Sequence, residues 1–256
     1  KERPQGLLGP EQQSHETERA LCREGGPQIN LCSEVLSFSR LANRIFQSAG
    51  GLGEEELDGG GRVLLMYRAV QGVAAQLKVY GRPSKRPAFL ASLLATADEL
   101  KSCRVPPQAL IQAGEEFAGP EGDKLRDLGL IFGEYDALAS RIALDPKDQL
   151  TRAADKLRQC RWARGKDLWL DGFTDFTPQQ RELLEILMAQ ASSLTVTLTC
   201  GTLEEDEGGV FDSARRTANT LLQSARREGI PCEVEHLVTS SPGKEAPLAH
   251  LEQALF

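Results

Sequence analysis

The residue that first suggests chemistry is Asp171, which follows the short apolar run Leu168–Leu170. A carboxylate at the end of a buried strand is the Walker B arrangement, in which the acid holds the Mg²⁺ of a bound nucleotide directly or through water. Aspartate also ends many buried strands because it caps the next turn, so the pattern alone fits both interpretations. The next residue is Gly172, where motor ATPases commonly have a glutamate that orients the attacking water, and no G-x-x-x-x-G-K-[ST] motif occurs in the sequence. We therefore interpret Asp171 as a degenerate Walker B residue and expect no ATP hydrolysis by this chain.

A second possibility is a metal site formed by Asp171 and Asp175, four residues apart across a turn. Such a pair of carboxylates would indicate a metal-dependent hydrolase. No histidine or third acid accompanies the pair nearby, and the three histidines of the chain are dispersed, with none in a nucleophile elbow. We expect no metal site and no nucleophilic catalysis, and we keep the hydrolase as an alternative.

The segment Ser37-Phe38-Ser39-Arg40, at the junction of a predicted strand and helix, suggests nucleic-acid binding. An aromatic ring and an arginine just beyond a strand can stack on a base and contact a phosphate. The same residues also fit an N-cap serine followed by a buried phenylalanine. Basic residues gather at 82–86 and 152–166, where they form either a solvated helix face or a track for nucleic acid.

Composition narrows the function further. The 256 residues carry a net charge of −7, so contact with a polyanion would need a local basic patch. The six cysteines include no C-x-x-C pair, which favours free thiols in the reducing cytoplasm. No apolar run reaches the roughly 18 residues of a membrane helix. The chain lacks an initiator methionine, and we expect it to be a piece of a longer protein.

The elements that position these residues are of the α/β type at the start of the chain. Apolar runs at 6–9 and 29–36 predict strands, and helices are expected at 13–23 and from Leu41 to the glycine pair that follows residue 49.

The α/β pattern returns after residue 164. Thr177, Pro178 and Gln180 form a capping box with proline at the first helical position, so a helix should start directly after the Asp171 turn. Alternating residues at 194–200 and 232–236 predict two strands, and helices are expected at 212–228 and 246–256.

The middle of the chain differs from both ends. Apolar residues at steps of three and four, punctuated by proline and glycine, predict an all-helical block from about residue 60 to about residue 162, after an acidic, glycine-rich linker. Parallel strands need a common sheet, so we expect the two α/β segments to form one sheet that the helices interrupt.

Four segments in the same order resemble a known family. Leu8–Gln12 is similar to its V-P-E/D-Q segment, Val35–Ala42 to its S-F-S-R-L-A signature, Asp171–Gln179 to its V-D-G-F-x-x-F-T-P-Q element, and Leu248–Glu252 to its L-x-H-L-E segment. The family is AddB, one component of the bacterial AddAB-type ATP-dependent helicase/nuclease and a relative of the superfamily 1, UvrD-like helicases. One departure is Asn43, where relatives often have a tryptophan.

The resemblance implies a RecA-like, P-loop NTPase-like parallel sheet with an inserted helical subdomain. Residues 1–53 would form the first part of domain 1A without its Walker A loop, residues 54–163 the helical insertion 1B, and residues 164–256 the second part of 1A. The nuclease and the iron–sulfur cluster of the family lie far C-terminal to the matching region.

For function, the resemblance implies single-stranded DNA contacts by Phe38, Arg40, Gln12 and Phe173, all within the matching segments. In the family, AddB is implicated in scanning single-stranded DNA for a recombination hotspot, and its AddA-type partner is the motor. The implied partners are therefore single-stranded DNA and an AddA-type motor/nuclease protein, in a cytoplasmic heterodimer. ATP and Mg²⁺ are expected only in the full-length parent. A helical docking module that contacts the motor protein without touching DNA remains an alternative.

Overall fold

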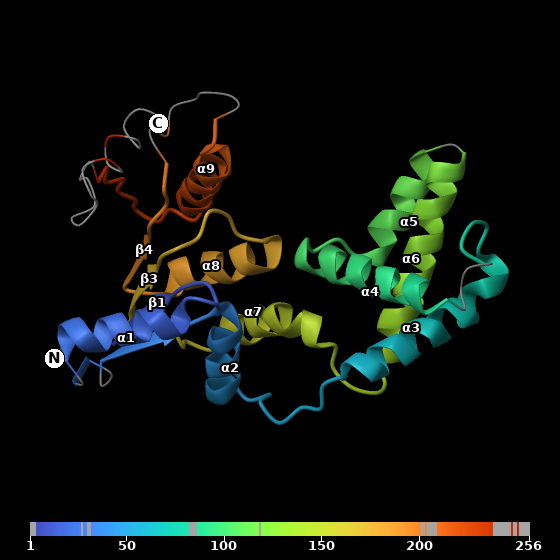
Figure 1. The fold of residues 1–256 in the computed structure, drawn as a ribbon, viewed down its shortest axis with the longest axis horizontal. Helices are drawn as coiled ribbons and strands as arrows, with labels where there is room; N and C mark the ends of the chain where they lie inside the picture. The colour runs from blue at the N-terminus through green and yellow to red at the C-terminus, as the bar shows by residue number, and fades with distance from the viewer. Residues whose placement is uncertain are drawn as a thin grey trace.

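Figure 1 shows the computed structural model of the chain, which describes residues 4–26, 28–29, 32–81, 86–117, 119–200, 203, 209–237, 247 and 250. Within these residues, strands and helices mix at the two ends of the chain and helices alone occupy its middle. None of the helices in these ranges has the length and apolar character that crossing a bilayer requires. In chain order the elements are β1 (Gln5–Leu8), α1 (Ser14–Gly25), β2 (Ser33–Leu36), α2 (Phe38–Ala49), α3 (Gly59–Val73), α4 (Pro87–Ser102), α5 (Pro107–Glu116), α6 (Pro120–Ala139), α7 (Gln149–Gln159), β3 (Asp167–Leu170), α8 (Pro178–Gln190), β4 (Ser193–Val196) and α9 (Asp212–Arg227).

The four strands form one parallel sheet in the order β2-β1-β3-β4. β1, from the start of the chain, pairs directly with β3, which follows the helical middle, and Leu8 lies opposite Leu170. Leu8 also lies opposite Leu36 of β2, and Leu170 lies opposite Val196 of β4. The prediction that the segments before and after the helices share one sheet is confirmed. Because the last residues of all four strands are in register, the strands end at the same level.

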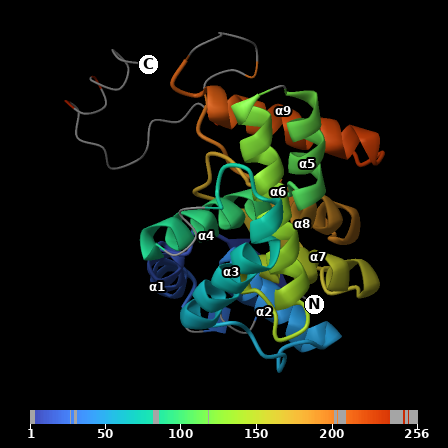
Figure 2. The ribbon, with the colours of Figure 1, turned by 90° about the vertical axis from the view of Figure 1, so that its right-hand side faces the viewer.

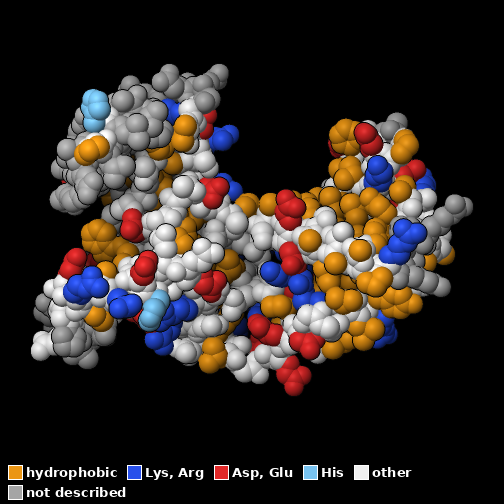
Figure 3. All heavy atoms as spheres, viewed as in Figure 1, with side chains coloured by type: hydrophobic (Ala, Val, Ile, Leu, Met, Phe, Trp, Pro, Cys, Tyr) orange, Lys and Arg blue, Asp and Glu red, His pale blue; other side chains and the backbone are white. Residues whose placement is uncertain are grey.

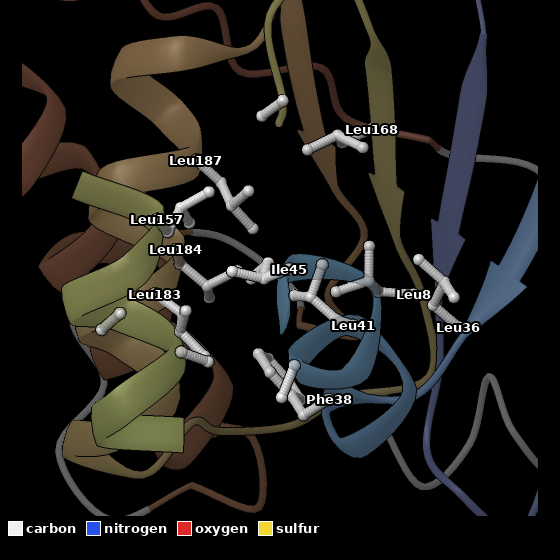
Figure 4. Packing of buried hydrophobic residues seen from close by; sticks show 14 of the residues in the cluster. Leu8, Leu36, Phe38, Leu41, Ile45, Leu157, Leu168, Leu183, Leu184 and Leu187 are labelled. Carbon is white, nitrogen blue, oxygen red and sulfur yellow. The ribbon is translucent and has the colours of Figure 1, made fainter. Parts of the chain in front are cut away.

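One face of this sheet packs against helices in an apolar core (Figure 4). Successive side chains of a strand point to opposite faces, and the inward side chains Leu8, Leu36, Leu168 and Leu170 are at most 1% exposed. Full burial of a leucine contributes roughly 1.5–3 kcal/mol, so the core holds the strand ends firmly against the helices. The helical side chains of this core include Leu41, Ile45, Leu157, Leu183, Leu184, Leu187 and Leu221.

A second apolar core lies among α3, α4 and α6, to the right of the sheet in Figure 1 and towards the viewer in Figure 2. The chain enters and leaves this region side by side, because Leu57 N–H donates to the Leu144 carbonyl at 2.8 Å and Leu144 N–H donates to the Glu55 carbonyl at 2.9 Å. α7 follows, but it packs in the sheet core through Ala153 and Leu157. Helix α7 therefore joins the sheet-side core although it continues the helical middle of the sequence.

Charged side chains are buried at the edge of the second core. Asp145 is 4% exposed; its Oδ1 lies 3.2 Å from Arg62 Nε, and its Oδ2 accepts a hydrogen bond from the Tyr135 hydroxyl at 2.9 Å. Asp98 pairs with the same guanidinium, and Lys101 Nζ lies 3.4 Å from Asp145. Burial opposes ionisation of Asp145, yet a backbone N–H and the two cations lower its pKa below the usual value. Burial together with the charge of Asp145 raises the pKa of Tyr135 to about 12.

Two predicted strands are shorter than their sequence patterns. β2 begins at Ser33 within the predicted stretch 29–36, of which residues 30 and 31 lie outside the described residues, and β4 ends at Val196 within the stretch 194–200. β2 and β4 are the edge strands, so each has a pairing partner on one side only. A pattern shows which residues favour an extended backbone, whereas the length of a strand depends on the neighbour it pairs with.

The strand predicted at 232–236 is wrong. Residues 230–237 pair with no described strand, and Val234 and Leu237 are 50% and 76% exposed. Alternation without a neighbouring strand leaves the backbone groups to water, and no ladder forms. The helix predicted at 246–256 lies outside the described residues, apart from Pro247 and His250.

Candidate nucleic-acid interface

The residues singled out from the sequence gather at one edge of the sheet. Gln12 follows β1, Phe38 and Arg40 follow β2, and Asp171 and Phe173 follow β3. Because the strands are parallel and end at the same level, these segments leave the sheet along its carboxyl edge, where ligands of open α/β sheets bind. The structure thus brings the start of α2 and the Asp171 turn to a common rim, as predicted.

Three aromatic rings connect the two segments. The Phe38 ring centroid lies 5.6 Å from that of Phe173 and 6.1 Å from that of Phe176, and the latter two are 5.0 Å apart. Phe38 is only 6% exposed, and Ser37 caps α2 by accepting a hydrogen bond from Arg40 N–H at 3.3 Å. The alternative of a capping serine followed by a buried phenylalanine describes this geometry. In this arrangement the Phe38 ring is not open to a base, whereas Phe173 and Phe176 are partly exposed.

Arg40 points along the sheet towards α1. Its side chain is 44% exposed, and Nη1 lies 2.9 Å from Glu18 Oε1. Arg44, one turn later on the same face of α2, pairs with Glu34 of β2. Both arginines are therefore held by carboxylates, and Arg40 remains accessible to solvent.

The two arginines line a hollow of about 640 Å³ between α1, β2 and α2. Trp162 and Lys166 close its far end, with Lys166 Nζ 3.3 Å from the centroid of the Trp162 ring. Burial lowers the pKa of Lys166, and the negative charge of nearby Glu34 partly offsets this decrease. No pattern in the sequence indicates this hollow, because its walls come from segments that lie far apart in the chain.

Asp171 occupies the turn after β3 with an exposed carboxylate. Its backbone N–H donates to the Leu8 carbonyl at 3.0 Å, and its Oδ1 accepts a hydrogen bond from the Thr197 hydroxyl. Sequence reasoning missed Thr197, although its position one residue after β4 would have placed it beside Asp171 once the sheet order was known. The pair supplies one carboxylate and one hydroxyl at the rim.

Gly172 is fixed by the conformation of that turn. Its φ is +80°, and a Cβ built on it would lie 2.9 Å from Gln13 Oε1 and 3.1 Å from Pro10 Cδ. A residue with a side chain would meet both backbone strain and a close contact there. The glutamate of motor ATPases therefore does not fit this position as the turn is built.

Helix α8 starts where the capping box predicts. Gln180 N–H donates to Thr177 Oγ1 at 3.3 Å, and Thr177 N–H donates to Gln180 Oε1 at 2.9 Å. Pro178 occupies the first turn. This cap fixes the chain direction after the aromatic residues and holds their loop at the rim.

Asp171 and Asp175 are not arranged as ligands of one metal ion in this structure. Asp175 Oδ2 accepts a hydrogen bond from Ser213 Oγ at 3.5 Å rather than sharing a ligand position with Asp171. Among the described residues, no group of three or more His, Cys, Asp or Glu side chains is arranged to hold a metal ion. The hydrolase alternative therefore draws no support from the geometry.

Two of the six basic residues in the stretch 152–166 are paired with acids. Arg152 lies 3.2 Å from Glu54 and 2.8 Å from Glu56, and Arg158 lies 2.5 Å from Glu182. These pairs connect α7 to the 54–56 segment and to α8. The structural interpretation therefore fits Arg152 and Arg158. Arg161 and Arg164 are exposed and form no ion pair with a described acid, so the nucleic-acid alternative stays open for them. Most of the other stretch, residues 82–85, lies outside the described part of the chain.

A parallel sheet with polar residues along its carboxyl edge and helices packed on it is compatible with the RecA-like fold of nucleotide-dependent motor proteins. The family model described as "ADDB, N-terminal" matches residues 1–252. The chain belongs to this family, in agreement with the resemblance of its four motifs.

Curated relatives similar to this chain are named as the B-type subunit of an ATP-dependent helicase/deoxyribonuclease. The protein of Pelotomaculum thermopropionicum is 34% identical over 262 residues, which cover 98% of this chain and 23% of the relative. The protein of Thermoanaerobacter sp. (strain X514) is 33% identical over 258 residues, covering 98% and 22%. That of Acetivibrio thermocellus is 31% identical over 261 residues, covering 99% and 23%. The chain thus spans less than a quarter of the length of these relatives.

Proposed function

We propose that this chain is the N-terminal RecA-like part of the helicase-like component of a cytoplasmic ATP-dependent helicase/nuclease that repairs double-strand breaks. Family membership and the names of the relatives support the proposal. Within it, residues 1–53 and 164–256 form domain 1A and residues 54–163 form the helical insertion 1B. The last helix of that insertion, α7, packs in the sheet core and so ties the two parts together.

In this proposal the chain contributes binding of single-stranded DNA rather than motor activity. The observation that carries it is the gathering of Gln12, Arg40 and Phe173, which follow three different strands, along one edge of the sheet. Arg40 has an exposed guanidinium for a phosphate, Phe173 a partly exposed ring for a base, and Gln12 an exposed amide. Phe38 acts through the position it gives Phe173.

ATP and Mg²⁺ belong, in this proposal, to the longer protein only. The described rim offers the carboxylate of Asp171 and the hydroxyl of Thr197, but no phosphate-binding loop. A bound nucleotide would supply Mg²⁺ coordinated near Asp171. The residues of this chain do not form that site by themselves, and Gly172 leaves no group to orient a water.

A second candidate is docking to an AddA-type motor protein, which would make the parent a heterodimer. Helix α3 exposes Val63 and Leu64 at 41% and 59%, and apolar side chains gather over the α3–α6 side of the molecule in Figure 3. Apolar surface of this kind marks contact sites of proteins. Salt separates the two roles, because DNA binding weakens steeply as salt rises.

The DNA role is tested by fluorescence anisotropy with a labelled single strand at several salt concentrations. Arg40→Gln should bind about tenfold more weakly than the wild type, the effect of losing one charge-assisted hydrogen bond. Arg68→Gln, an equal charge change at an exposed position of α3, is the control and should bind like the wild type. Equal affinity of the wild type and Arg40→Gln, with little dependence on salt, would contradict the DNA role and favour docking.

A further inference from the structure

A small cleft between α8 and α9 is lined by two arginines, one serine and two threonines. It has a volume of about 180 Å³. Arg181 comes from the first turns of α8, and Ser213, Arg216, Thr217 and Thr220 come from α9. Guanidinium groups are hydrogen-bond donors to an anion, and nothing in this lining is a carboxylate. Of the hydroxyls, Ser213 Oγ donates to Asp175 Oδ2 at 3.5 Å and Thr220 Oγ1 to the Arg216 carbonyl at 2.7 Å, so the Thr217 hydroxyl is the one that can add to the arginines.

The walls of the cleft are fixed by packing. Leu221 of α9 is 8% exposed and belongs to the sheet core. Ser224 Oγ donates to Glu185 Oε1 of α8 at 2.6 Å, and Arg227 Nη2 lies 3.1 Å from the same oxygen. Figure 1 shows α9 lying against α8 as a result. These contacts place the arginines of the two helices on the same cleft.

The two cations of the cleft stand out from their surroundings because they are not neutralised. Neither Arg181 nor Arg216 forms an ion pair with any residue that the structure describes, whereas Arg104, Arg158 and Arg227 nearby are all paired with acids of α8. Arg216 Nε donates only to the Asp212 backbone carbonyl, at 3.3 Å. Two guanidinium groups lining one cleft repel each other unless an anion lies between them.

Two helix ends add to the positive potential. Helix α8 begins at Pro178 and α9 at Asp212, so Arg181 and Ser213 both belong to the first turns of their helices. The N-terminus of a helix carries a partial positive charge, which favours an anion such as a phosphate. The acid Asp212 of this region is paired with Arg215.

The cleft adjoins the proposed DNA rim. Phe176 lines the cleft, and its ring lies 5.0 Å from Phe173 and 6.1 Å from Phe38. We propose that Arg181 and Arg216, with the Thr217 hydroxyl, bind a backbone phosphodiester of the same DNA strand that contacts Phe173. This inference rests on the proposed function, and it adds a phosphate contact on α8 and α9 that none of the four matching motifs contains.

The test measures how the affinity of the purified protein for a labelled single strand falls with salt. Each phosphate contact adds about 0.7 to the slope of log K against log salt for single strands, so Arg181→Gln/Arg216→Gln should reduce the slope by about 0.7–1.4. Arg181→Lys/Arg216→Lys keeps the charge and should keep most of the slope. Arg68→Gln/Arg126→Gln, which removes two exposed arginines of α3 and α6, should leave it unchanged.

Three other results would overturn the proposed phosphate contact. An unchanged slope in the Gln pair, with binding still weakened by Arg40→Gln, overturns the cleft and leaves the DNA role standing. A wild type that binds no DNA at low salt overturns both. Inorganic phosphate that raises the Tm of the wild type but not of the Gln pair, at constant ionic strength and with no effect on the DNA slope, would show a site for a free anion and overturn the phosphodiester.

Discussion

At the scale of single residues, the rim is shaped by what surrounds each functional group as much as by the group itself. Arg40 is exposed but held by Glu18, Asp171 is exposed but held by Thr197, and Phe38 is buried beneath Phe173. A residue can thus match a family motif and still be available only in part. The neighbouring side chains therefore determine how accessible each of these residues is to a ligand.

Removing Glu18 should strengthen DNA binding. The carboxylate competes with a phosphate for Arg40, and exposed ion pairs of this kind contribute about 0.2–1 kcal/mol, so Glu18→Gln should tighten binding by up to about fivefold. Titration of a labelled single strand at fixed salt measures the change. Glu16→Gln makes the same charge change on exposed α1, and a gain of equal size there would mean that net charge, not release of Arg40, is responsible.

Gly172 should tolerate no side chain. Gly172→Ala places a Cβ at φ +80° and 3.1 Å from Pro10 Cδ, and the positive φ should destabilise the protein by about 1–3 kcal/mol. Urea denaturation measures the loss. Gly53→Ala is the matched control, since no atom lies within 4 Å of its Cβ, and it should be neutral or slightly stabilising. Equal stability of the two variants would contradict this account of the turn.

At the scale of elements, the second core depends on the charges that link α3, α4 and α6 to the exit segment. Asp145 accepts from Tyr135 and faces two cations while almost fully buried. Such a site is stable only when all its members are present, because one missing partner leaves a buried charge unpaired.

Asp145→Asn should therefore destabilise the protein by about 3–5 kcal/mol. The contribution of Asp145 to stability should also depend on pH. The pKa of Asp145 is lowered on folding, so its stabilisation is complete above the usual carboxyl pKa and is lost as pH falls through the lowered value. The wild type should lose more stability than Asp145→Asn between about pH 5 and pH 3, measured by chemical denaturation. Asp155→Asn, at an exposed pair on α7, should change little, and parallel acid profiles for wild type and Asp145→Asn would refute the role.

Elements defined by local signals could be predicted, and contacts between distant segments could not. The cap of α8 uses only Thr177 and Gln180, three residues apart, and the pattern was sufficient. The shared rim of Arg40 and Asp171 followed from the rule that parallel strands end together. The pair of Thr197 with Asp171, the hollow at Arg44 and the cleft at Arg216 join segments with no common pattern, so only the structure shows them.

At the scale of the whole molecule, the sheet-side core and the α3–α6 core carry different candidate binding surfaces. The sheet side carries the candidate DNA contacts, and the α3–α6 side carries the exposed apolar residues of α3. A chain with a net charge of −7 attracts a polyanion only through local basic groups, and two arginines of α7, Arg152 and Arg158, are neutralised by acids. We expect DNA binding at the rim and the α8–α9 cleft.

The adjacent backbone crossings at Leu57 and Leu144 have a wider consequence. When the two ends of an inserted segment lie next to each other, the segment can change in length or sequence between relatives without shifting the strands before and after it. The helices between residues 57 and 144 can therefore differ between relatives while the sheet edge with the proposed DNA contacts keeps its geometry.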